Sequence, residues 1–93
     1  MPDPITLVVS AEKADSLASL TEKALMTNHA EAEVLARELV DIMQILHGPG
    51  HLEVGVALFY LGLALEEQGK LAEAMSIRQR ARTILLGQGL WRN

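Results

Sequence analysis

The sequence contains no cysteine, which excludes a disulfide scaffold, thiolate catalysis and any zinc site built on cysteine ligands. Aromatic residues make up only 3% of the chain, as one Phe, one Trp and one Tyr. The apolar content of 49% is therefore carried by aliphatic side chains, and the prominent leucines and alanines favour helix. The sequence also lacks an apolar run long enough to span a bilayer and a secretory leader. We expect no membrane insertion.

The charge balance is acidic, with 12 Asp and Glu against 8 Lys and Arg, a net charge of −4 and a pI near 5.2. A large basic footprint for phosphate backbones is missing, so we expect no nucleic-acid partner. The length of 93 residues suits one domain. Cytoplasmic localisation is the default expectation.

The first half of the chain predicts an arm and a helical hairpin. Two prolines and a short β-branched run disfavour helix at the start, so residues 1–9 are expected to form an N-terminal arm. Ser10 can cap a helix that runs to about Met26. Asn28 followed by Glu31 resembles a capping box that starts a second helix. These two helices make the first hairpin, over residues 10–47.

The second half predicts a second hairpin after a sharp turn. Gly48, Pro49 and Gly50 break the helix, so residues 48–51 form an inter-repeat turn. Nearly every residue from 52 to 65 is apolar, which is typical of a helix buried on more than one side. Gly69 separates this helix from the next, which ends near residue 86. Residues 52–86 are therefore the second hairpin and residues 87–93 a C-terminal tail.

An internal repeat relates the two hairpins. The triplet Ala30-Glu31-Ala32 matches the triplet Ala72-Glu73-Ala74, an offset of 74 minus 32, or 42 residues. The second unit, with Gly62 after a leucine in its first helix and Ala74 and Ala81 in its second, resembles a tetratricopeptide repeat. The resemblance implies an all-α fold of two antiparallel hairpins, four helices in all, stacked as a right-handed array.

The long offset and the turn from His47 to Val54 resemble the repeats of kinesin light chains. Glycine, proline, histidine and valine of that pattern are present, and Leu52 stands where the family has a second proline. The first repeat departs more, with Thr21 near the small position. The same signature also resembles the helical C-terminal domain of SET and MYND methyltransferases, which would make the chain a helical accessory fragment of a larger enzyme.

The family frame implies a concave groove that is apolar and rimmed by acids. The alternative is that Phe59 and Tyr60 fill core between the hairpins, as aromatics at helical spacing usually do. The predicted partner-binding residues are Val56, Phe59, Tyr60, Leu63, Glu66 and Glu67. The predicted function is a non-catalytic adaptor or scaffold for another protein or peptide.

The remaining predictions concern packing and self-association. Helix contacts are expected at Leu58, Leu61, Gly62, Gly69, Ala74 and Ala81. A homodimer is the alternative function, because two repeats are fewer than such arrays usually need. Its predicted contact residues are Leu71, Met75, Ile77, Ile84, Leu85 and Trp91.

Other polar residues do not predict a catalytic or metal site. His47 and His51 are four residues apart, but the turn between them breaks the helical geometry that a metal site would need, and a capping or solvent-exposed role is expected. At 100° per residue Arg78 and Arg82 share one helix face and Arg80 points away, which indicates solvated surface. No nucleophile with a base, and no glycine-rich phosphate loop, is apparent. We expect no enzyme and no cofactor.

Overall fold

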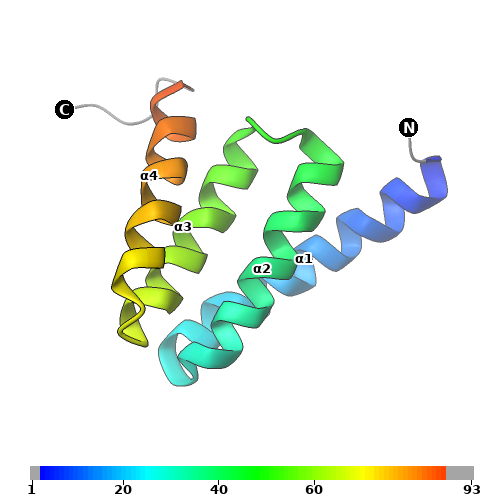
Figure 1. Ribbon diagram of the computed structural model, residues 1–93. Helices are drawn as coiled ribbons and strands as arrows, with labels where there is room; N and C mark the ends of the chain where they lie inside the picture. Colours follow the sequence, from blue (N-terminus) through cyan, green and yellow to red (C-terminus); the bar gives the residue numbers. More distant parts are fainter. Residues whose placement is uncertain (1–2, 88–93) are drawn as a thin grey trace.

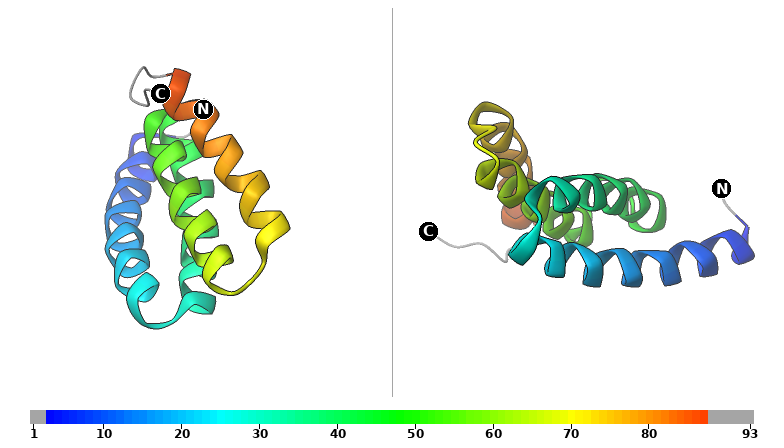
Figure 2. Two further views of the ribbon diagram at one scale, coloured as in Figure 1. Left: turned by 90° about the vertical axis from the view of Figure 1, so that its left-hand side faces the viewer. Right: turned by 90° about the horizontal axis from the view of Figure 1, so that it is seen from below.

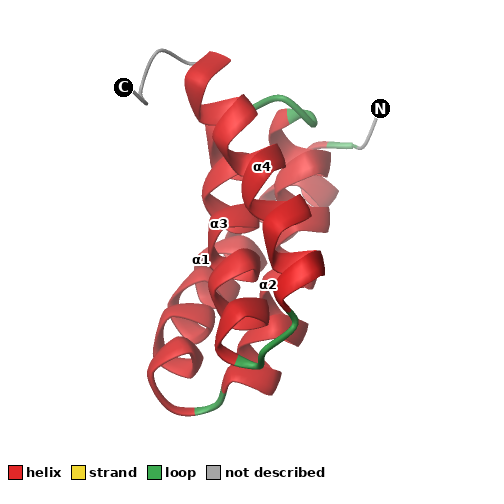
Figure 3. Ribbon diagram, turned by 60° about the vertical axis from the view of Figure 1, so that its left-hand side comes forward, coloured by secondary structure: helices red, strands yellow, loops and turns green. Residues whose placement is uncertain are grey.

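The computed structural model describes residues 3–87, and this part of the chain consists of four helices with short connections (Figures 1 and 3). They are α1 (Pro4–Thr27), α2 (His29–His47), α3 (Leu52–Glu67) and α4 (Leu71–Gly87). No strand occurs over residues 3–87. The predicted all-α class with four helices is therefore confirmed. Trp91 and most of the predicted tail lie outside the described residues.

The helices form two antiparallel hairpins that lie side by side (Figures 1 and 2). Helix α1 packs against α2, and α3 packs against α4. Helix α3 also packs against α2 and touches α1 more lightly. It therefore lies between α2 and α4 and joins the hairpins.

The start of α1 corrects the predicted arm. The expectation that helix begins only at Ser10 was wrong, because α1 begins at Pro4. Proline fits the first turn of a helix, where its missing N–H has no partner to lose and its fixed φ is already helical. The Asp3 carboxylate caps this turn by accepting the Thr6 amide N–H over 2.8 Å. The β-branched residues that follow lower helix propensity only slightly.

The three connections are built from residues whose local chemistry ends one helix and starts another. Asn28 Oδ1 accepts the Glu31 N–H over 3.1 Å, which confirms the predicted cap of α2. His51 Nδ1 accepts the Glu53 N–H over 3.1 Å and caps α3. Gly48 and Gly69 have φ values of 88° and 78°, in the left-handed region that glycine adopts without steric cost.

The core consists of aliphatic side chains and alanines. Leu39, Leu58 and Leu65 are almost completely buried, and alanines on every helix let the helices approach closely. Thr21 is the exception among the buried residues, and its hydroxyl donates to the Leu17 carbonyl over 2.6 Å. Over residues 3–87, no helix combines the length and the apolar character needed to cross a membrane.

Candidate functional site

The open side of α3 carries the residues predicted to line a groove. Val56, Phe59, Tyr60 and Leu63 are half-buried, and Glu66 and Glu67 at the end of the helix are exposed. We call the first four the α3 strip. They differ from the buried α3 residues, such as Leu58, Leu61 and Leu65, which face the core. The α3 strip is therefore neither full core nor free surface.

Tyr60 lies on the side of the α3 strip that faces α1. Its hydroxyl donates to Glu22 Oε1 over 2.8 Å. The pKa of Tyr60 is raised, first by burial and then by the bond to Glu22 and the negative charges of Glu22 and Glu53. Both carboxylates therefore act on the tyrosine, and a cationic group brought to this place would meet two acids.

Phe59 lies on the opposite side of the α3 strip, toward α4. It packs against the central core cluster and lines a hollow of about 750 Å³ between α3 and α4. Tyr60 does not line that hollow. Glu66 forms an ion pair with Arg78 of α4, so this part of the predicted acidic rim is neutralised. The six predicted residues therefore serve two neighbouring surfaces rather than one.

Close packing of α3 on α4 depends on small residues. A Cβ added to Gly62 would lie 2.6 Å from Arg78 Cγ, which is shorter than the distance between non-bonded carbon atoms in proteins. Ala74 and Ala81 are 2% and 1% exposed and pack in the core clusters. Gly69 has the positive φ that the α3 to α4 turn requires.

The predicted self-association residues of α4 divide into an inner and an outer set. The inner set is Ile77, Ile84 and Leu85, which are half-buried. Ile84 packs closely on α3, because a Cβ added to Gly55 would lie only 3.0 Å from Ile84 Cγ2. Leu71 and Met75 are 59% and 72% exposed. A dimer through α4 would have to form from the outer set, and it stays a prediction.

A charged network between the hairpins was not predicted from the sequence. Glu33 of α2 accepts from Lys70 Nζ over 2.8 Å, from Gln68 Nε2 over 2.9 Å and from Arg37 Nε over 3.0 Å. These bonds, that from Lys70 first, lower the pKa of Glu33 to about 2. Arg37 also reaches Glu73 of α4 over 2.6 Å. The spacing of Glu33 and Arg37 suits an ion pair on one helix, whereas nothing in the sequence revealed the partners on the second hairpin.

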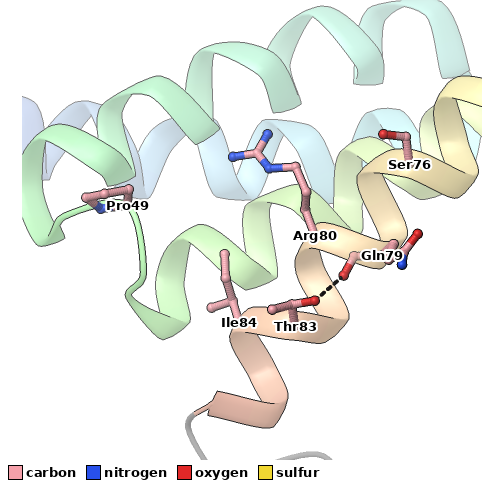
Figure 4. Close-up of a pocket in the computed structure, with 6 residues that line it drawn as sticks. All are labelled: Pro49, Ser76, Gln79, Arg80, Thr83 and Ile84. Carbon is pink, nitrogen blue, oxygen red and sulfur yellow. Dashed lines mark hydrogen bonds between the residues drawn. The ribbon is translucent and has the colours of Figure 1, made fainter.

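Arg80 is separated from Arg78 and Arg82, as its phase on the helix predicts. It lines a second hollow, which we call the turn hollow, together with Pro49, Ser76 and Ile84 (Figure 4). Arg78 and Arg82 line the hollow beside Phe59 instead. The three arginines therefore belong to two different surfaces.

The histidines at the inter-repeat turn stack on each other, with ring centroids 4.5 Å apart. His51 uses its Nδ1 to cap α3, as described above. No group of three or more His, Cys, Asp or Glu residues within residues 3–87 is placed to hold a metal ion.

Residues 15–86 match the family described as the tetratricopeptide repeat. The match covers most of α1 and the whole of α2 and α3, and it extends to the last turn of α4. Neither the curated proteins nor the solved structures gave a match to the chain. The fold of two hairpins and the matched range agree, and the chain belongs to the tetratricopeptide-repeat family.

Proposed function

We propose that the chain is a non-catalytic interaction module that binds a peptide or helix of another protein along the α3 strip. Tetratricopeptide repeats generally mediate protein–protein interaction. The observation that supports this surface is the half-buried state of Val56, Tyr60 and Leu63 on one side of α3, together with the effect of the Glu22 and Glu53 carboxylates on Tyr60.

The chemistry of this surface suggests a partner with apolar and basic side chains. Glu67 is exposed at the end of the α3 strip, and Glu22 and Glu53 lie near Tyr60. Burying one large apolar side chain contributes about 1.5 to 3 kcal/mol. Three or four such contacts support binding near the micromolar range once the costs of association are subtracted.

A random peptide library displayed on phage and selected on the full chain tests this proposal. We expect enriched peptides that combine Lys or Arg with apolar residues and that lose binding to a Leu63→Glu variant. The matched control is Val34→Glu, because Val34 is an apolar residue of α2 that is 65% exposed. It should bind the same peptides as the unmodified chain.

Two results would count against the proposal. Peptides that bind Leu63→Glu as well as the unmodified chain would place their site elsewhere. A Leu63→Glu chain that has lost its helicity by circular dichroism, with a stable Val34→Glu chain beside it, would assign Leu63 to the core.

A further inference from the structure

The second hairpin carries a hollow that shares Phe59 with the α3 strip and otherwise lies on α4. It is lined by Phe59 of α3 and by α4 residues that include Met75, Arg78, Arg82 and Leu86. We call these five residues the end face. Met75 is 72% exposed and Leu86 is 42% exposed, so apolar surface is open to solvent there.

The first hairpin shows what covers the corresponding face of α2. With the offset of 42 residues, Arg78 and Arg82 correspond to Ala36 and Val40. Ala36 is buried with Leu61 and Leu65 of α3. Val40 is buried in the cluster that holds Val54, Ala57 and Leu58 of α3. The face of α2 is therefore covered by α3, which lies beside it in Figure 1. Within residues 3–87, α4 packs against α3 alone, so its corresponding face is open to a helix placed in the same way.

The chemistry of the end face differs from that of its counterpart. On α2 the centre of the face is apolar, with Ala36 and Val40, and the corresponding places on α4 hold two arginines. Arg78 is paired with Glu66, but Arg82 forms no ion pair with any residue from 3 to 87. Covering Arg82 with an apolar helix would bury an unpaired charge, which is costly. The covering helix therefore needs a carboxylate at its centre.

The two ends of the end face are apolar where the corresponding positions of α2 are polar. Met75 and Leu86 stand where α2 has Glu33 and Gln44. The matching helix is thus apolar toward its two ends and acidic between them, unlike α3, whose Leu61 and Leu65 pack on Ala36. A two-fold contact between copies would bring the Arg78 and Arg82 region of one chain near the same region of the other. Charge therefore favours a different protein over a second copy.

We infer that the end face binds an amphipathic α-helix of another protein, which places apolar side chains on Met75, Leu86 and Phe59 and a carboxylate on Arg82. This surface shares only Phe59 with the α3 strip, and its charge preference is the reverse. A module with both surfaces holds a basic apolar segment along α3 and an acidic helix at the end of the second hairpin.

The test uses two stapled helical peptides of the length of α3, 16 residues. One has leucines toward both ends of one face and two glutamates between them, and the other has two lysines in place of the glutamates. Fluorescence anisotropy with the full chain measures both affinities. We expect the glutamate peptide to bind more tightly, Arg82→Glu to weaken it about tenfold, and the lysine peptide to gain affinity for that variant.

Arg80→Glu is the matched control, since it makes the same charge change on the same helix but at the turn hollow. It should leave both affinities unchanged. Equal affinity of the two peptides, equal losses in Arg80→Glu and Arg82→Glu, or no binding of the glutamate peptide near about 1 mM would each overturn the inference.

Sedimentation of the chain alone tests the competing occupant, a second copy. A monomer mass that persists on dilution supports the inference. A dimer that Met75→Glu dissociates would place a second copy on the end face and would overturn it.

Discussion

Replacement of Glu33 by Gln should destabilise the fold at neutral pH and lose this effect in acid. The carboxylate accepts from Lys70, Gln68 and Arg37, and its pKa is lowered from 4.5 to about 2. One pKa unit corresponds to about 1.4 kcal/mol, so the full shift would contribute about 3 kcal/mol. Lys70 and Arg37 are 50% and 42% exposed, and solvent screens such pairs. The expected loss is therefore about 1 to 2 kcal/mol.

The sign of the pH dependence follows from the direction of the shift. A carboxylate with a lowered pKa in the folded state stabilises fully above its unfolded pKa of 4.5 and loses this contribution as the pH falls toward 2. The difference between Glu33→Gln and the unmodified chain should therefore shrink by about half at pH 3 relative to pH 7.

Urea denaturation followed by circular dichroism at both pH values measures the difference. Asp41→Asn is the control, because Asp41 is exposed on the same helix and forms no ion pair within residues 3–87. A Glu33→Gln deficit of the same size at pH 7 and pH 3 would show that lost packing rather than lost charge causes it. No deficit at pH 7 would refute the role of the network altogether.

Three further predictions concern the backbone and the helix contacts. Gly62→Leu should overpack the α3 and α4 contact at Arg78 and lower stability by about 1 to 3 kcal/mol; an unchanged melting temperature would contradict this. Asn28→Ala should cost about 1 kcal/mol because α2 loses its cap, and a chemical denaturation curve identical to that of the unmodified chain would argue against it. Asp3→Ala should speed amide hydrogen exchange at Thr6 while leaving the melting temperature nearly unchanged, since this cap is exposed; equal exchange rates would disprove the capping of α1.

The helices were predictable where the sequence contains both an apolar pattern and a boundary residue. Asn28, Gly48 and Gly69 have side-chain chemistry or backbone freedom that acts locally, so their roles can be inferred without knowing the fold. The start of α1 is not predictable from proline alone, because proline both breaks helices and begins them. Asp3, a residue type that caps helices, directly precedes Pro4 and indicates that this proline begins a helix rather than ends one.

The candidate surfaces were only partly predictable. Helical phase alone separated Arg80 from Arg78 and Arg82, because it depends on a fixed angle per residue. The partners of Glu33 and of Tyr60 were not predictable, because Lys70 and Glu22 are 37 and 38 residues away along the chain. These pairs depend on which helices pack together and on how far each is shifted along its axis. A local sequence pattern contains no information on either.

Asn28 has a consequence for where the chain can accept change. It is the sole residue between α1 and α2; its N–H closes α1 on the Ala24 carbonyl over 2.7 Å, and its side chain opens α2. An added residue there would separate these two functions and alter the angle between the helices. Pro49, in contrast, is exposed in a connection of four residues, 48–51. Insertions and grafted loops should therefore be tolerated in the connection 48–51 between the hairpins and poorly tolerated at Asn28, between α1 and α2.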